Sequence, residues 1–195
     1  MDAAQLADVI ARAKQRDPAA FEMLVELYGT RLYGYFYRFT GSRDEAEDLL
    51  QETFIRMVRM IGRYEHNGRF DGWIFAIATN LVRDRVRRSK TAKAAGFHPR
   101  LQAAEEEDEA GPLGNFPDAA AGEPMNRLEQ AEQVEQLQQA IAQLPEPERE
   151  VILLRHFSQL SFREIAEQMQ TPLGTALARA HRGLAHLREI MEASD

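Results

Sequence analysis

The stretch that decides the fold runs from Ser42 to Arg88 and reads SRDEAEDLLQETFIRMVRMIGRYEHNGRFDGWIFAIATNLVRDRVRR. It predicts two helices joined by a short loop. The first begins at a capping box, in which the side chains of Ser42 and Glu45 each accept the other residue's backbone N–H. Its apolar residues recur at helical spacing: Ala46, Leu50, Phe54, Met57 and Ile61. One stripe of this helix is therefore expected to face a core.

The loop covers residues 63–69 and contains the turn-forming pair Asn67-Gly68. The second helix is predicted from Phe70 to Arg88, with a buried stripe of Phe70, Trp73, Ile74, Ile77 and Leu81. Another face of the same helix carries Asn80, Asp84, Arg87 and Arg88. Arginine and asparagine contact phosphates and base edges, and aromatic side chains stack on unpaired bases. Alternatively, the arginines only complement the negative end of the helix dipole, and periodicity alone does not separate the two interpretations.

Composition narrows the class of protein. The chain has 195 residues, 44% of them hydrophobic, which supports a folded core. It has no apolar run of membrane-spanning length, no secretory pattern at its N-terminus and no cysteine, so we expect a soluble cytoplasmic protein without direct membrane insertion. Its five histidines are scattered, and no nucleophile–base constellation stands out. We therefore expect no enzyme, no metal, no cofactor and no small-molecule substrate.

Charge is segregated along a chain whose net charge is −7. Between residues 83 and 100 the only acid is Asp84, against the basic residues Arg83, Arg85, Arg87, Arg88, Lys90, Lys93 and Arg100. A run of five acidic residues follows at 105–109. A locally basic surface on an acidic protein predicts DNA contact that depends on another partner.

The rest of the chain predicts an all-α protein with two small helical domains. Residues 1–88 form the first domain, in which a short helix from Ala3 to Gln15 precedes a long one that starts at Asp17-Pro18 and stops at Gly41. Residues 89–125 are poor in large apolar side chains and are expected to be a flexible linker. Residues 126–195 form the second domain.

The second domain contains a predicted helix-turn-helix. A capping box at Ser161 and Glu164 opens its first helix, and Thr171-Pro172 starts the next one by an N-cap followed by proline. Arginines follow on the outer side of that last helix. The pattern alone is shared by many helix pairs that do not bind DNA.

Two sets of residues carry a resemblance to a known family. In the first domain they are DLLQETF at 48–54 and the pattern Phe70-x-x-Trp73-Ile74-x-x-Ile77-Ala78-x-Asn80-x-x-x-Asp84-x-x-Arg87-Arg88. In the second they are LPE at 144–146, REV at 149–151, LSF-x-EIA at 160–166, and GT at 174–175 with Arg179 and Arg182. Together they resemble an extracytoplasmic-function (ECF) sigma factor of the sigma-70 family, over residues 17–88 and 128–188.

The resemblance implies a transcription initiation factor that binds core RNA polymerase, recognises the −10 and −35 promoter elements and promotes melting. It also implies an anti-sigma factor as a partner, which can hold such a protein near the inner membrane. The residues that match the polymerase-docking face are Asp48, Gln51, Glu52 and Ile55. Those assigned to the −10 element are Tyr64, His66, Asn67, Arg69, Trp73, Asn80, Asp84, Arg87 and Arg88.

The −35 element is assigned to Arg149, Thr175, Ala178, Arg179 and Arg182. Here the chain departs from the family, because Ala176-Leu177-Ala178 stands where a β-branched residue, a basic residue and a serine are usual. Helical phasing predicts that Thr175, Ala178, Arg179 and Arg182 face outward, and that the buried side carries Leu173, Leu177, Ala180 and Leu184. Arg179 and Arg182 are then expected to supply most of the contact.

Other interpretations remain open. A sigma-like decoy would sequester an anti-sigma partner without directing transcription, although known decoys carry a fused receiver domain that has no counterpart here. A conventional helix-turn-helix regulator would use its first domain to dimerise. The acidic run at 105–109 is either a solvated spacer or an RNA mimic near the RNA exit path.

Overall fold

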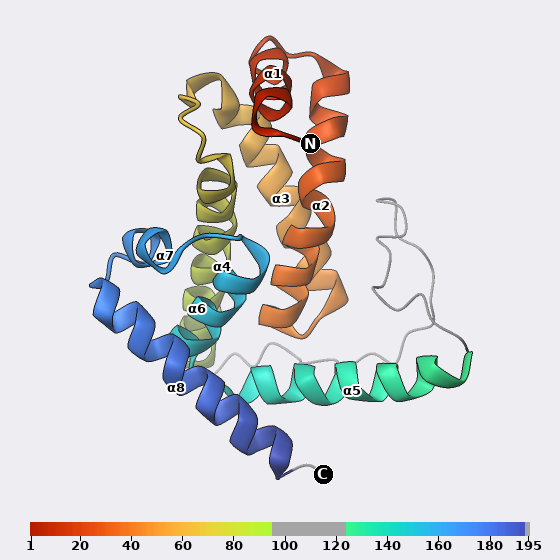
Figure 1. Ribbon diagram of the computed structural model, residues 1–195, viewed down its shortest axis with the longest axis vertical. Helices are drawn as coiled ribbons and strands as arrows, with labels where there is room; N and C mark the ends of the chain where they lie inside the picture. Colours follow the sequence, from red (N-terminus) through yellow and green to blue (C-terminus); the bar gives the residue numbers. More distant parts are fainter. Residues whose placement is uncertain (95–123, 194–195) are drawn as a thin grey trace.

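Eight α-helices and one short 3-10 helix make up residues 1–94 and 124–193, the part of the chain that the computed structural model describes. The N-terminal helices are α1 (Ala3–Lys14), α2 (Pro18–Thr40), α3 (Arg43–Met60), η1 (Ile61–Arg63) and α4 (Phe70–Ala94). The C-terminal helices are α5 (Pro124–Gln143), α6 (Glu146–Phe157), α7 (Phe162–Gln168) and α8 (Leu173–Glu192). These ranges contain no strand, so the all-α prediction is confirmed (Figure 1).

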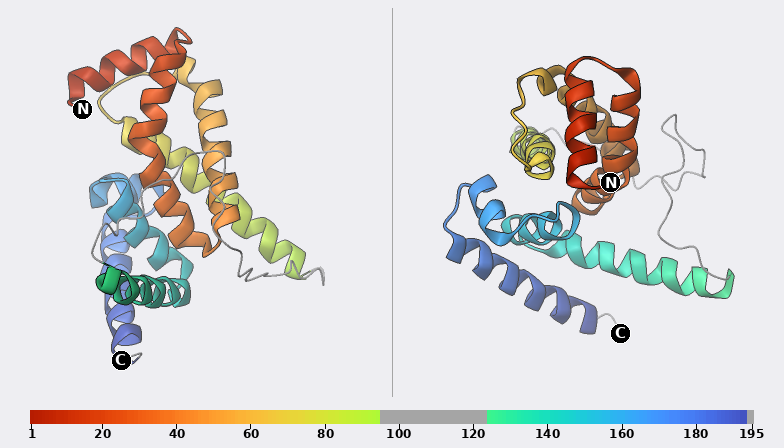
Figure 2. Two further views of the ribbon diagram at one scale, coloured as in Figure 1. Left: turned by 90° about the vertical axis from the view of Figure 1, so that its right-hand side faces the viewer. Right: turned by 45° about the horizontal axis from the view of Figure 1, so that its top comes forward.

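The helix α4 is longer than its predicted range, which ended at Arg88. It continues to Ala94, because Ser-Lys-Thr-Ala-Lys-Ala at 89–94 contains neither proline nor glycine. Its four residues other than alanine favour helix less than alanine by at most about 0.7 kcal/mol each. Its last turns extend beyond the other N-terminal helices (Figure 2, left). Most of the predicted linker, including the acidic run at 105–109, lies outside the described residues.

The long helix α2 begins and ends where the sequence predicts. The Asp17 side chain accepts the backbone N–H of Ala19 at 3.0 Å, and Pro18 occupies the first helical position. At the other end, Gly41 adopts the left-handed conformation with φ +73°, which a residue with a side chain adopts at a cost. The chain then turns into α3.

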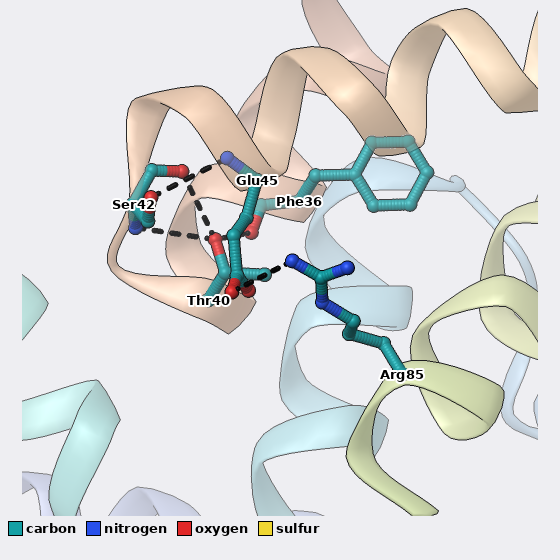
Figure 3. Close-up of polar contacts among 5 residues, drawn as sticks. All are labelled: Phe36, Thr40, Ser42, Glu45 and Arg85. Atoms are coloured by element: carbon teal, nitrogen blue, oxygen red, sulfur yellow. Dashed lines mark hydrogen bonds and ion pairs between the residues drawn. The ribbon is translucent and has the colours of Figure 1, made fainter. Parts of the chain in front are cut away.

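At the start of α3, half of the predicted capping box is present (Figure 3). The Ser42 hydroxyl accepts the N–H of Glu45 at 3.3 Å, but the N–H of Ser42 goes to Thr40 Oγ1 at 3.2 Å. The Glu45 carboxylate is therefore released to pair with Arg85 of α4, at 3.0 Å. The reciprocal bond was wrongly predicted, and its replacement ties α3 to α4.

Large aromatic side chains fill the core between α2, α3 and α4. Tyr28, Tyr35, Phe36, Phe70 and Phe75 are all fully buried. The ring of Tyr35 meets that of Phe75 edge-on at 5.8 Å between centroids, and Tyr28 lies 5.4 Å from Phe70. Such pairs add about 0.5–1.5 kcal/mol each beyond the burial of apolar area. This core fixes the orientation of α4 relative to α2.

The C-terminal helices contain the predicted helix-turn-helix, formed by α7 and α8. Ser161 and Glu164 make the complete capping box: the Ser161 hydroxyl accepts from Glu164 N–H at 3.3 Å, and the carboxylate accepts from Ser161 N–H at 2.9 Å. The predicted cap at Thr171 is wrong. The helix α8 starts at Leu173 with Pro172 in the cap position, and the Thr171 hydroxyl is buried without a partner.

Small residues form the buried side of α8, contrary to the predicted phase. The buried positions are Ala176, Ala180 and Gly183, whereas Leu173, Leu177 and Leu184 are exposed. The helix α6 approaches so closely that a Cβ on Gly183 would lie 2.7 Å from Ile152 Cδ1. Only small residues fit such a contact, so Ala180 was correctly predicted as buried and the three leucines were not.

The C-terminal helices lie directly against the N-terminal ones (Figures 1 and 2). The helix α6 packs on α2, where Arg31 Nε donates to the Phe157 carbonyl at 2.9 Å. The helix α5 also contacts α2, with Gln138 Nε2 donating to the Tyr37 carbonyl at 3.2 Å. A third contact joins α4 and α7.

Candidate nucleic-acid interface

The outward face of α4 carries the polar side chains that the sequence predicts to meet DNA. Asn80, Arg87 and Arg88 are exposed, and the Arg87 side chain keeps 77% of its accessible surface. Its guanidinium lies 3.0 Å from the Asp84 carboxylate, one turn earlier. Because residues four and seven apart share a helix face, Asn80, Asp84 and Arg87 form one polar row. Such a row can contact phosphates and base edges.

Trp73 lies two turns before Asn80, at the other end of the same row. Its side chain, predicted in the buried stripe, is half-buried, with its ring 4.8 Å from Tyr64 and 5.2 Å from Phe70. A pocket of about 360 Å³ opens beside it, lined by Arg59, Met60, Arg63, Tyr64 and Trp73. Aromatic rings and guanidinium planes are the surfaces on which unpaired bases stack. The pocket therefore has the chemistry to hold an extruded base.

Three of the pocket residues, Arg59, Met60 and Arg63, were missed by the sequence analysis. Arg59 and Met60 end α3, and Arg63 ends η1 at the start of the predicted loop. The available signal was an outward methionine between arginines at the end of an amphipathic helix; Met60 is 46% exposed. An exposed thioether beside two cations fits a binding surface better than a core.

The helix α1 supports the loop that carries Tyr64, His66, Asn67 and Arg69. Lys14 Nζ donates to the Tyr64 carbonyl at 2.8 Å, and burial raises the pKa of the Tyr64 hydroxyl, which therefore stays protonated at neutral pH. The hydroxyl lies 3.4 Å from His66 Nδ1. Asn67 Oδ1 accepts the Arg69 N–H at 3.3 Å. His66, Asn67 and Arg69 are exposed, and of the loop residues in the −10 set only Tyr64 lines the pocket.

A separate face of α3 carries the residues predicted to dock on polymerase. Asp48 and Gln51 are exposed, and Ile55 keeps 44% of its surface. Glu52 pairs with Arg56 within the helix, at 2.7 Å. An exposed isoleucine among carboxylate and amide groups is a surface suited to a protein partner.

On α8, the residues predicted to read the −35 element lie on the outer side. Thr175, Ala178 and Arg179 are half-exposed. Arg182 is more exposed, and its Nε donates to Glu148 Oε1 of α6 at 3.2 Å. His186 Nδ1 lies 2.8 Å from the other carboxylate oxygen of Glu148. Thus α6 holds Arg182 at the surface of the recognition helix.

Arg149 lies away from this group, at the junction with the N-terminal helices. Its guanidinium donates to the Phe39 carbonyl at 3.2 Å, to the Leu144 carbonyl at 3.1 Å, and to the Ala142 carbonyl. It also stands over the Phe39 ring at 5.5 Å. Burial lowers the pKa of Arg149, without changing its charge at neutral pH. The structure thus separates it from the other four −35 residues.

Within residues 1–94 and 124–193, no three histidine, aspartate or glutamate side chains are grouped so as to hold a metal ion. None of the described helices combines the length and the apolar character that crossing a bilayer requires.

Two models of one protein family match the two halves of the chain. The family model Sigma-70 region 2 matches residues 24–91, and Sigma-70, region 4 matches residues 134–187. The chain is 34% identical to the ECF RNA polymerase sigma factor SigW of Bacillus subtilis over 187 residues, covering 92% of this chain and 93% of that protein. It is 35% identical to the RNA polymerase sigma factor CarQ of Myxococcus xanthus, over 88% and 89% of the two chains.

The fold also matches solved structures. CnrH in complex with the cytosolic domain of CnrY aligns with a TM-score of 0.64 at 22% identity, covering 96% of this chain and 97% of that one. The sigma factor RpoE of Bartonella quintana, in complex with the anti-sigma factor NepR, gives 0.65 at 20% identity over 90% and 98%. The fold and the site thus define a sigma-70 type protein. The chain belongs to the ECF sigma factors, the promoter-specific initiation factors of RNA polymerase.

Proposed function

We propose that residues 1–88 dock on core RNA polymerase and capture the −10 element, and that residues 126–195 read the −35 element. The observation that carries the proposal is the pocket beside Trp73, at one end of the exposed polar row of α4. A single strand lying along Asn80 and Arg87 would reach the pocket within two helical turns, about 11 Å. One base could then enter the pocket while its neighbours stay on α4.

Base capture at this pocket would drive melting. Unstacking and unpairing a base costs a few kcal/mol, and stacking on protein side chains returns about 1–3 kcal/mol per base. Tyr64 and Trp73 would supply the stacking surface, while Arg59 and Arg63 would contact the base or its phosphate. The loop residues His66, Asn67 and Arg69 would line the path of the strand. In this proposal Asp84 orients Arg87, with which it is paired.

Recognition of the −35 duplex would rest on α8. Arg179 and Arg182 supply charged donors, each worth about 1–3 kcal/mol of discrimination if bound to guanine through two hydrogen bonds. Leu177 is exposed, so it would meet the groove beside Ala178 and favour thymine methyl groups. Arg149 would reach DNA only after leaving its carbonyl partners.

We further propose that the chain acts in the cytoplasm with core polymerase and promoter DNA, by binding alone and without a cofactor. An anti-sigma factor is the other expected partner. Support for it comes from the similar fold of CnrH and RpoE, which were solved with CnrY and with the anti-sigma factor NepR.

The experiment that tests the proposal is run-off transcription by the full chain with core polymerase, together with Asp48→Lys/Glu52→Lys on the exposed face of α3. Removing one partner of an interfacial charge pair commonly costs about 2–5 kcal/mol, so polymerase affinity should fall by more than about tenfold at unchanged helicity. Glu22→Lys/Glu26→Lys, exposed on α2, is the matched control. Full affinity in the α3 variant removes this face from the proposal, and absence of any run-off product would favour a decoy or a conventional regulator.

A further inference from the structure

A buried carboxylate of α6 is bound by two side chains of the recognition helix α8. The two helices pack side by side, and Glu148 is only 6% exposed between them (Figure 1). Its Oε1 accepts from Arg182 Nε at 3.2 Å, and its Oε2 lies 2.8 Å from His186 Nδ1. An ionised carboxylate can only accept, so the proton of the second bond belongs to His186. Both oxygens of Glu148 therefore hold α8.

The close contact at Gly183 brings Glu148 to this place. A Cβ on Gly183 would lie 3.1 Å from Glu148 Cβ, so a larger residue would push the carboxylate away from α8. Glu148 also lies in the first turn of α6, where the helix dipole stabilises negative charge. A carboxylate is costly to bury unless it is paired and hydrogen-bonded, and here it is both.

Arg182 is held at one side of its guanidinium and open at the other. Its side chain keeps 56% of its accessible surface, whereas the Glu148 side chain that binds it keeps 8%. The bond to Glu148 uses Nε and leaves the terminal amino groups Nη1 and Nη2 for another acceptor. Two such groups can donate together to O6 and N7 of guanine. The guanidinium thus has a fixed inner edge and a free outer edge.

The neighbouring positions make the orientation of Arg182 decisive. Ala178 lies one turn earlier on the same face and carries no polar group. Arg179 is half-exposed, and its charge acts on the carboxylate of Glu150 in α6. Among the residues assigned to the −35 element, Arg182 is the most exposed. Base reading by this part of α8 therefore depends strongly on where the Arg182 guanidinium points.

We propose that Glu148 is a positioning residue for promoter recognition, which holds Arg182 so that its two terminal amino groups read one base pair of the −35 element. The proposal rests on the −35 function proposed above for α8. A free arginine side chain loses rotamer freedom when it binds DNA, and that loss lowers affinity about two- to twelvefold. Glu148 imposes the order before DNA arrives. The preorganised guanidinium therefore favours the correct base over the others by that factor.

Selection from a DNA library tests the proposal. Holoenzyme made from the full chain and core polymerase is bound to duplexes with randomised −35 and −10 hexamers, and the bound DNA is sequenced. Arg182→Ala should weaken the base preference at one −35 position by about fivefold or more. Glu148→Met, which is close to glutamate in size but a poor acceptor, should weaken it at the same position by about two- to twelvefold. In the Arg182→Ala background, Glu148→Met should change no preference further, because it acts through Arg182.

Two further variants separate positioning from a structural role. Glu148→Gln keeps an oxygen that accepts from Arg182 Nε and should retain the preference; a loss as large as that of Arg182→Ala overturns the proposal, even if Glu148→Met does not fold. Glu189→Ala removes an exposed carboxylate seven residues after Arg182 on the same face of α8 and should change no preference.

The remaining outcomes separate this proposal from the function on which it rests. An equal loss at every −35 position in Glu148→Met, or a further loss in the double variant, overturns the positioning role and leaves −35 reading by α8 intact. A wild-type holoenzyme that enriches no −35 sequence overturns the proposed function itself.

Discussion

The bundle of α2, α3 and α4 and the unit of α6, α7 and α8 differ in what fills their interiors. Among the described residues, all the fully buried aromatic side chains belong to the N-terminal half: Tyr28, Tyr35, Phe36, Phe70 and Phe75. The C-terminal half buries smaller, aliphatic side chains such as Leu154 and Ile165. In the other half, α8 buries only Ala176, Ala180 and Gly183. The first interior gives rigid support to the pocket that we propose captures an extruded base. The second lets helices approach closely, which turns the large side chains of α8 outward.

The largest effect is expected from Phe75→Ala in the N-terminal core. Truncating a fully buried phenylalanine costs about 3–5 kcal/mol, because apolar contact is lost and a cavity remains. Urea unfolding measures the change, with Thr30→Ala on the exposed side of α2 as the control. A smaller loss of stability than that of Gly183→Val in α8 would contradict the proposed difference between the two interiors.

A smaller loss is expected from Gly183→Val in α8. The new Cβ would meet Ile152 Cδ1 at 2.7 Å and Glu148 Cβ at 3.1 Å, and overpacking of this kind costs about 1–3 kcal/mol. Gly174→Ala on the same helix has no atom within 4 Å of its new Cβ and should not destabilise the chain. Thermal unfolding of both variants separates the close helix contact from a general effect of losing glycine. Equal melting temperatures would show that α6 and α8 can move apart freely.

The N-terminal caps of α3 and α7 provide a further comparison between the two halves. Ser161→Ala removes a complete capping box and should cost about 1 kcal/mol, whereas Ser42→Ala removes one hydrogen bond and should cost less. Hydrogen exchange in the first turns of α7 and α3 reports each loss locally. Greater fraying at α3 than at α7 would contradict the presence of the reciprocal bond at α7 and its absence at α3.

The smallest effect is expected from Glu150→Gln, and it depends on pH. Burial, opposed by Arg83, raises the pKa of Glu150 above its ordinary value of 4.5. The wild type is therefore fully stabilised below that ordinary value and loses this stability as pH rises through the raised pKa. Glutamine imitates the protonated form, and the remaining Arg83 is hydrated. The variant should match the wild type in acid and be slightly more stable at neutral pH; a variant less stable at neutral pH than in acid, relative to the wild type, would contradict this.

The sequence correctly predicted features that depend on residues close together in the chain. Alternation at helical spacing identified the core face of α3, and the starts at Asp17 and Ser161 follow from side chains that cap their own helices. Two errors have tertiary causes. Arg85 draws Glu45 out of its capping box, and α6 admits only small residues along α8. Neither partner is near in sequence.

The candidate site likewise has parts that the sequence predicts and parts that depend on tertiary contacts. The polar row on α4 follows from periodicity, as does the exposed Ile55 among the polar residues of α3. The pocket does not, because it needs the end of α3, the loop and Trp73 to meet in space, and α1 to support Tyr64 through Lys14. The ion pair between Lys90 and Glu146 joins α4 to a helix more than fifty residues away.

Permanganate footprinting of one promoter, with core polymerase and either Arg63→Ala or Arg179→Ala, tests the division of labour most directly. Arg63 lines the pocket and is exposed, so its loss should leave initial promoter binding intact and disfavour melting by about 1–3 kcal/mol, the value of stacking one base. Arg179→Ala should reduce promoter occupancy and its sequence preference, with normal thymine reactivity in each complex that does form. Normal melting by Arg63→Ala, or a melting defect in the bound complexes of Arg179→Ala, would contradict the assignment of strand capture to the N-terminal half and duplex reading to α8.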